Sequence, residues 1–329
     1  MMRRLPACLA MAALLASAVA AASETTADDL VAKMVRAVDQ LNYEGIFVFS
    51  QENRMETMHI LHGRDEQGSR ERLTALTGEL REVIKDDHSI TCIRADSGSV
   101  CMEPRKTLMG MPGMSPLRGG TEGLRDNYRV NAGASYRIAG LSCREVAILP
   151  RDELRYGHRL CIHEDSGMLL KAQLQGHDGG VLEQFMFTHI EFPESVDEER
   201  FQPTLEGEGF TVQRLEKRDR PEREVMEPAP HWHLRDLPRG FDVTAVRKRA
   251  MDANPHPVQH MVLSDGMATV SVFISRAERP EDLLVGVTRS GALHAAARPV
   301  GDYQITVLGE VPAATVRLIA ESVVHEESP

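Results

Sequence analysis

The chain has 329 residues, of which 42% are hydrophobic, 5% aromatic and 26% charged. This length is typical of two domains, and the composition excludes a wholly disordered protein. The formal net charge of −11 argues against a protein that coats nucleic acid or an anionic membrane, because both require an excess of lysine and arginine.

Residues 1–22 have the pattern of a secretory signal peptide. Arg3 and Arg4 give a positive start, an apolar run extends to Val19, and small residues at 18–22 offer cleavage sites. A membrane anchor that is not cleaved is the alternative. We expect an exported protein of a bacterial periplasm, with 36 basic against 49 acidic residues and a net charge of −13 after cleavage.

Four cysteines follow the predicted signal peptide: Cys92, Cys101, Cys143 and Cys161. An oxidising compartment favours disulfides between them. The first two flank the turn residues 96–98 and the last two flank Pro150–Glu153, so each pair is placed to close a hairpin. Three pairings are possible, and four free thiols or a metal site are the alternative.

The mature chain is predicted to open with an amphipathic helix. Thr26 is placed to cap this helix, and Asp29 follows three residues later. The apolar residues Leu30, Met34 and Val38 then repeat on one helical face.

From Tyr43 to Phe192 the pattern changes to strands that alternate polar and apolar residues. The predicted strands are Gly45–Ser50, Glu56–His62, Glu71–Leu76, Glu82–Lys85, Ser89–Arg94, Ser99–Glu103, Tyr128–Asn131, Ser135–Ile138, Cys143–Leu149, His158–His163, Leu169–Gln175 and Val181–Ile190. Consecutive antiparallel strands after one helix predict a curved sheet or partial barrel folded around that helix.

Residues 104–125 interrupt the strands with three prolines and five glycines. A long loop of this kind is often a functional lid, and the alternative is a surface loop without a role. Its methionines, which suit varied apolar ligands, are Met109, Met111 and Met114. In and beside the loop lie basic residues that are candidates to receive phosphate or carboxylate groups: Arg105, Lys106, Arg118, Arg125 and Arg129.

Residues 206–228 are predicted to be a solvated linker, since 12 of these 23 residues are charged. The linker separates an N-terminal domain at 23–205 from a C-terminal domain at 229–329. In the latter, Val258–Leu263 and Ala268–Ser275 form a predicted hairpin, Asp302–Leu308 a further strand, and Pro312 starts a helix. This pattern predicts a small α+β domain.

The motifs of common exported enzymes are missing. There is no Gly-x-Ser-x-Gly elbow, no His-Glu-x-x-His helix and no phosphate-binding glycine loop. The nearest approach to a metal cluster is His158, Cys161 and His163, but strand alternation places residue 158 on the other face. We therefore predict no catalytic residue, no metal and no cofactor, and a binding protein; an unfamiliar hydrolase is the alternative.

Several segments, in the same order along the chain, resemble the RseB/MucB family of periplasmic regulators. They are Tyr43–Phe49, Arg70–Leu73, Arg81–Val83, Pro150–Asp152, Arg155–Gly157, Asp165–Lys171, Pro238–Phe241, Asp265–Gly266, Ser271–Ile274 and Leu308–Pro312. Their ordered combination over most of the mature chain carries the resemblance.

The resemblance implies an N-terminal unclosed antiparallel β-barrel around a helix, similar to the lipoprotein carriers LolA and LolB, and a smaller α+β C-terminal domain. It implies binding to the periplasmic region of a RseA/MucA-like anti-sigma factor, to which the C-terminal domain contributes. The bound factor is shielded from regulated proteolysis, and lipid or lipopolysaccharide fragments release it. A second copy of the chain is a further candidate partner. A periplasmic lipid or lipoprotein carrier is the rival function.

An acyl chain would lie on the concave side of such a barrel. Phe47 and Phe49 are predicted to line it, with either Met186 or the pair Phe185 and Phe187 from the last strand. The loop methionines would extend this apolar surface, and the basic residues of the loop would meet lipid phosphates or an acidic partner. Core packing is the alternative for the aromatic residues.

Overall fold

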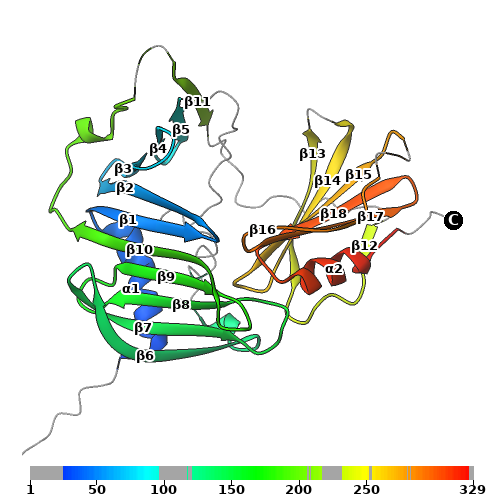
Figure 1. The fold of residues 1–329 in the computed structure, drawn as a ribbon, viewed down its shortest axis with the longest axis horizontal. Coiled ribbons are helices and arrows are strands. Elements are labelled where there is room, and N and C mark those ends of the chain that lie inside the picture. Colours follow the sequence, from blue (N-terminus) through cyan, green and yellow to red (C-terminus); the bar gives the residue numbers. More distant parts are fainter. Residues whose placement is uncertain are drawn as a thin grey trace, which may run out of the picture.

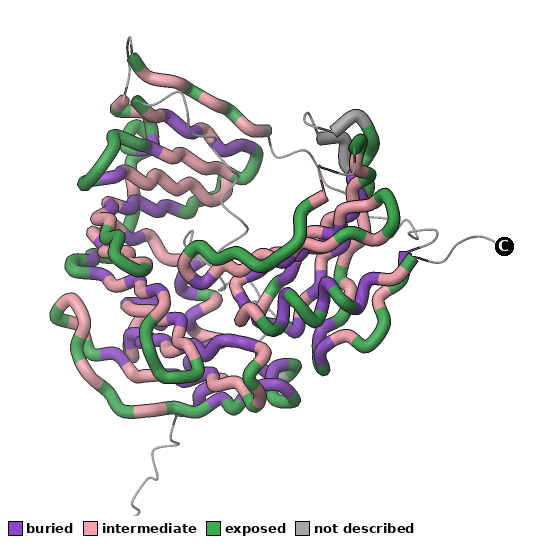
Figure 2. Tube along the Cα trace, turned by 45° about the vertical axis from the view of Figure 1, so that its right-hand side comes forward, coloured by how far each residue is buried: buried purple, intermediate pink, exposed green. Residues whose placement is uncertain are grey.

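The computed structural model describes residues 25–95, 117, 121–205, 207, 209–216, 232–251, 254–279, 281 and 283–325. Two large antiparallel sheets form this part of the chain, and each carries one α-helix (Figure 1). Buried positions alternate with more exposed ones along many strands of both sheets (Figure 2), as expected where one face of a sheet is covered.

The N-terminal sheet has 11 strands in the order β11-β5-β4-β3-β2-β1-β10-β9-β8-β7-β6. Helix α1 contacts β6, β7 and β8. The strands are β1 (Tyr43–Gln51), β2 (Arg54–Asp65), β3 (Gly68–Ala75), β4 (Arg81–Lys85), β5 (Ser89–Arg94), β6 (Tyr128–Ile138), β7 (Leu141–Pro150), β8 (Gly157–His163), β9 (Leu169–Gln175), β10 (Val181–Glu191) and β11 (Thr211–Glu216). Two 3-10 turns, η3 (Glu122–Leu124) and η4 (Glu198–Phe201), complete this N-terminal unit.

Helix α1 (Ala27–Gln40) begins as the sequence predicts. The Thr26 hydroxyl accepts a hydrogen bond from the Asp29 N–H at 3.1 Å, and the Asp29 carboxylate accepts one from the Thr26 N–H at 3.1 Å. This capping box satisfies two donors that the first turn leaves unpaired. The apolar face buries Leu30, Met34 and Val38 in the core of the N-terminal unit.

Two parts of the N-terminal sheet differ from the prediction. The predicted strands 128–131 and 135–138 are one strand, β6, with a register shift between Ala132 and Ser135 that absorbs the break in alternation. Within the predicted linker, Thr211–Glu216 form β11 and pair with β5. An edge strand forms hydrogen bonds on one side only and tolerates charged residues. The composition of β11 is therefore also typical of a solvated linker. The predicted strand 99–103 lies outside the described residues.

The C-terminal sheet has six strands in the order β13-β14-β15-β18-β17-β16, and β12 pairs separately with β19. Helix α2 (Ala313–Ser322) contacts β17 and β18. The strands are β12 (Trp232–Leu234), β13 (Asp242–Met251), β14 (Asn254–Ser264), β15 (Thr269–Arg276), β16 (Gly286–Ser290), β17 (Leu293–Val300), β18 (Tyr303–Gly309) and β19 (Val323–His325). The predicted hairpin, later strand and helix are all present, which confirms a separate α+β unit.

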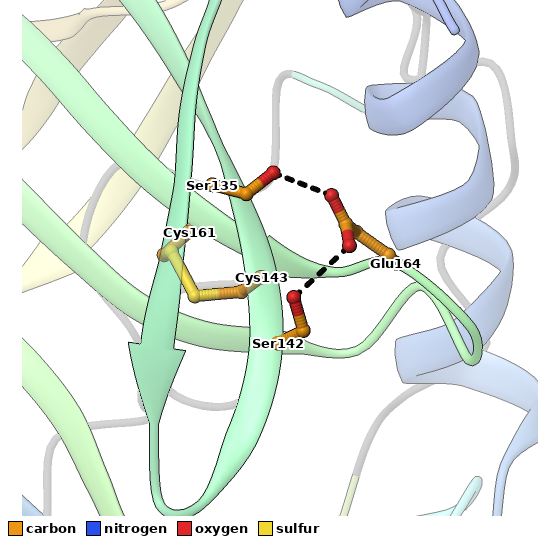
Figure 3. Close-up of a disulfide and its surroundings, with 5 residues drawn as sticks. All are labelled: Ser135, Ser142, Cys143, Cys161 and Glu164. Atoms are coloured by element: carbon orange, nitrogen blue, oxygen red, sulfur yellow. Dashed lines mark hydrogen bonds between the residues drawn. A yellow bond between two sulfur atoms is a disulfide. The ribbon is translucent and has the colours of Figure 1, made fainter.

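Cys143 and Cys161 form a disulfide that joins β7 to β8, with their Cα atoms 5.4 Å apart (Figure 3). Glu145 lies opposite Cys161, so the two cysteines are diagonal neighbours across the hairpin. Just beyond β8, the Glu164 carboxylate accepts hydrogen bonds from the hydroxyls of Ser135 and Ser142 at 2.6 and 3.0 Å. These bonds lower the pKa of Glu164. The predicted closure of this hairpin is confirmed.

The other predicted pair is described only in part. Cys92 is disulfide-bonded, and Cys101 lies outside the described residues.

Removing the hairpin disulfide should destabilise the N-terminal unit. The cysteines are 18 residues apart, so the Cys143→Ala/Cys161→Ala variant is expected to lose about 3 kcal/mol of unfolding free energy in urea titrations. Ser135→Ala is the control, since loss of one exposed hydrogen bond costs about 1 kcal/mol or less. Equal stabilities of the two variants would contradict this prediction.

Candidate functional site

An apolar row crosses the face of the N-terminal sheet that packs on α1. Strand register places Val146, Leu160, Ala172, Phe185 and Phe49 opposite one another in turn, on β7, β8, β9, β10 and β1. Residues directly opposite on antiparallel strands point to the same face of the sheet. We call these five residues the apolar row; Phe49 and Ala172 are partly exposed and the other three are buried.

Three predicted aromatic residues form one cluster at the row. The ring centroid of Phe47 lies 4.8 Å from that of Phe185 and 6.0 Å from that of Phe187, and the latter two rings are 5.0 Å apart. All three side chains are buried in the core with α1. Met186, the alternative to Phe185 and Phe187, is one residue out of phase with them and therefore points to the opposite face. Phe49 is the most exposed of the four predicted phenylalanines.

A second row lies two residues farther along each strand, on the same face. His158, Leu174, Glu183 and Gln51 are opposite one another in turn, and we call them the rim row. The amide of Gln51 donates to the Glu183 carboxylate at 2.5 Å. Burial raises the pKa of Glu183, against the hydrogen bonds from Gln51 and the Ala292 N–H, and burial lowers the pKa of His158 to about 4. The apolar face thus ends in a largely buried row that contains three polar side chains, of His158, Glu183 and Gln51.

Arg155 joins the two units through a fully buried ion pair. Its Nη1 donates to Asp265 Oδ2 at 2.8 Å, and both side chains have no exposed surface. Its Nη2 donates to the Arg239 carbonyl at 2.6 Å and its Nε to Asp152 Oδ1 at 3.0 Å. The guanidinium also lies over the Phe241 ring, 5.2 Å from its centre. Residues from four segments that carry the family resemblance therefore meet here.

The Asp265 carboxylate is fully occupied. Its Oδ2 also accepts from the Tyr128 hydroxyl at 2.9 Å, and its Oδ1 accepts from the N–H groups of Met267 and Ala268 at 2.9 and 2.7 Å. Burial and the Asp265 charge raise the pKa of Tyr128 far above its usual value, so this hydroxyl remains a donor. Composition and spacing gave no sign of this site, although the motif residues Arg155 and Asp265 marked its position.

Of the five predicted basic residues, Arg125 and Arg129 lie among the described residues. Arg125 forms an ion pair with Asp28 at the start of α1, and Arg129 is exposed on β6. Arg105, Lys106, Arg118 and the loop methionines Met109, Met111 and Met114 lie outside the described residues.

The described residues contain no cluster of three or more histidine, cysteine, aspartate or glutamate side chains that could hold a metal ion. No helix among them is both long and apolar enough to cross a membrane.

Models of two protein domains match this chain. The MucB/RseB N-terminal domain matches residues 26–205, and the MucB/RseB C-terminal domain matches residues 226–324. The chain belongs to the MucB/RseB family. It is 29% identical to the sigma factor AlgU regulatory protein MucB of Pseudomonas aeruginosa over 93% of each chain, and 24% identical to the sigma-E factor regulatory protein RseB of Haemophilus influenzae over 94% of this chain and 95% of that protein. Membership in a family of regulatory proteins confirms that the chain is not an enzyme.

Solved structures of MucB are similar to this chain over both of its units. MucB in complex with MucA(peri) is 25% identical and aligns with a TM-score of 0.70 over 92% of this chain and 100% of that chain. The Pseudomonas aeruginosa MucA/MucB complex aligns with a TM-score of 0.71 over 92% of this chain and 99% of that chain. A structure of MucB alone is 26% identical and aligns with a TM-score of 0.60 over 91% of this chain and 98% of that chain. The present structure is thus more similar to these two complexes than to this structure of MucB alone.

Arg155→Ala should be strongly destabilising, because it leaves the Asp265 carboxylate buried without its cation. We expect a loss of about 3–5 kcal/mol in urea unfolding. Arg159→Ala is the matched control, because the Arg159 pair with Glu145 is partly exposed and worth about 1 kcal/mol or less. Equal losses in the two variants would show that the Arg155 pair is not buried in solution.

His158 should make the stability depend on pH. Its folded pKa of about 4 lies below the ordinary value of about 6.5, so its contribution is complete above pH 6.5 and is lost as the pH falls toward 4. His158→Leu should remove up to about 3 kcal/mol of this acid sensitivity, measured as melting temperature against pH. The control His189→Leu replaces an exposed histidine on β10 and should show the same dependence of melting temperature on pH as the wild type. The same dependence in all three proteins would refute the role of His158.

Proposed function

We propose that this chain binds the periplasmic region of a MucA/RseA-like anti-sigma factor and shields it from regulated proteolysis. The observation that carries this proposal is the alignment of both units with MucB in complex with MucA(peri), over 92% of this chain. The higher similarity to two MucA-bound structures than to MucB alone supports the same conclusion. The chain then controls an envelope-stress sigma factor through a protein partner, without contact with nucleic acid.

The proposed location is the periplasm. It is supported by the signal-peptide pattern at residues 1–22 and by the disulfide between Cys143 and Cys161, which needs an oxidising compartment. A homologue that binds MucA(peri) supports it as well.

The proposed release signal is a lipid or lipopolysaccharide fragment whose acyl chain lies along the apolar row. Phe49 and Ala172 are partly exposed, so an acyl chain makes its first contacts with them while the buried aromatic cluster stays closed. Each buried methylene contributes about 0.8 kcal/mol, so a short length of acyl chain is enough for micromolar binding. The basic residues of the loop are the proposed contacts for phosphate, whereas Arg129 points to the face of β6 opposite to the apolar row.

We assign lipid sensing to a domain at 23–205 and a share of anti-sigma binding to a domain at 229–329. The buried contact of Arg155 with Asp265 supports a joint role, because it ties the two units together. A lipid or lipoprotein carrier would leave this contact and the C-terminal unit without a role. A homodimer stays a prediction.

Calorimetric titration of the mature chain with the periplasmic region of the MucA/RseA-like anti-sigma factor from the same organism tests the partner. We expect micromolar or tighter binding and slower cleavage of the bound factor by the site-1 protease. MucB of Pseudomonas aeruginosa with MucA is the positive control. Binding in the control but none with this chain would refute the proposed function.

A further inference from the structure

Strand β16 lies at the side of the C-terminal unit that is nearest to the N-terminal sheet (Figure 1), and the turn that joins it to β17 meets the rim row at Leu174 and Gln51. Ala292 in this turn is fully buried, packed with Tyr156 and Leu174 of the N-terminal unit. Beside it, Arg289 Nη2 lies 3.7 Å from the Glu52 carboxylate, and His294 Nδ1 lies 3.3 Å from the Tyr156 hydroxyl. The turn and the strands on either side of it therefore contact the N-terminal unit, at the sheet residue Leu174 and at the connections that contain Glu52 and Tyr156.

Gly291 shows how close this approach is. A Cβ atom at this position would lie 2.5 Å from Nε2 and 2.7 Å from Cδ of Gln51. Gly301, in the next turn between β17 and β18, has nearly the same left-handed backbone, with φ of +57° against +61°. A Cβ atom at Gly301 would meet no heavy atom within 4 Å. The two turns thus share a backbone requirement, and only Gly291 lies against the rim row.

The turn also stands at the end of the path proposed for an acyl chain. Gln51 and Glu183 are two residues beyond Phe49 and Phe185, on the same face. Two residues of strand span about 7 Å. The Ala292 N–H is close enough to the Glu183 carboxylate to lower its pKa, so the turn lies against the residue that borders the apolar row.

We propose that the β16–β17 turn is a plug on the proposed lipid site, and that an acyl chain extending past Phe49 and Phe185 displaces it. This inference rests on the proposed function. Displacement removes the Ala292, Arg289 and His294 contacts and leaves the Arg155–Asp265 pair as a pivot between the units. Lipid then weakens the arrangement that resembles the MucA-bound structures, and the anti-sigma factor must weaken lipid binding by the same factor.

Hydrogen exchange of the mature full-length chain tests the plug, with cis-parinaric acid as a fluorescent fatty-acid probe. Saturating probe should accelerate amide exchange in residues 286–297, which contain the turn. Exchange in β14 and β15, on the far side of the C-terminal sheet, should not change. Bound probe with unchanged exchange at 286–297 would overturn the plug and leave the lipid site standing.

A pair of glycine variants gives a second, independent measurement. Gly291→Val places its side chain against Gln51 and should raise the affinity for cis-parinaric acid by roughly tenfold, with an equal loss of affinity for the anti-sigma region. Gly301→Val carries the same backbone strain in open space and should bind both as the wild type does. Adding Gln51→Ala to Gly291→Val makes room for the valine side chain. The double variant should recover part of the wild-type affinities for cis-parinaric acid and for the anti-sigma region.

The outcomes separate the two proposals. Equal probe affinities in folded Gly291→Val and Gly301→Val would overturn the plug alone. If neither the wild type nor Gly291→Val binds the probe, the lipid site is wrong and the plug falls with it. Circular dichroism checks that each variant is folded, and if Gly291→Val is not, exchange in the wild type decides.

Discussion

The arrangement of the two units depends on one requirement, that a guanidinium buried without water must have its charge balanced and its donors satisfied. Arg155 meets this requirement through Asp152 on its own unit and through Asp265 and the Arg239 carbonyl on the other. Removing either partner would leave the other charge buried without a counterion, at a cost of about 3–5 kcal/mol. The satisfied donors of Arg155 and the fully occupied Asp265 carboxylate therefore fix this contact between the units.

The contact at the β16–β17 turn is of the opposite kind. It buries one methyl group of Ala292, whose hydrophobic contribution is about 0.8 kcal/mol, and its other contacts are the single polar ones of Ala292, Arg289 and His294. In the proposed mechanism, a ligand that buries several methylenes, at about 0.8 kcal/mol each, competes with these few contacts. The contact at the turn then gives way first, and the C-terminal unit turns about the Arg155–Asp265 pair without dissociating.

The elements that the sequence predicted are those whose pattern depends only on residues close together in the chain. The capping pair at Thr26 and Asp29, most of the alternating strands and the hairpin between Cys143 and Cys161 are local patterns that the structure confirms. The edge strands β11 and β16 were not predicted, because a charged edge and a strand exposed at every residue show no alternation. Arg155 and Asp265 are 110 residues apart, and no local pattern indicates that they meet. The motif segments marked their positions without indicating their pairing.

The aromatic residues show why core packing and ligand binding need not be alternatives. Phe47, Phe185 and Phe187 fill the interior with α1, which is the packing interpretation. The same row continues to Phe49 and Ala172, which are partly exposed, and then to Glu183 and Gln51 under the turn. A ligand on this face therefore lies against the core without entering it, and its reach along the strands sets what it displaces. A short chain would cover Phe49 alone, and only a chain long enough to meet Glu183 would act on the C-terminal unit. Chain length, more than head group, then distinguishes a lipid that signals from one that merely binds.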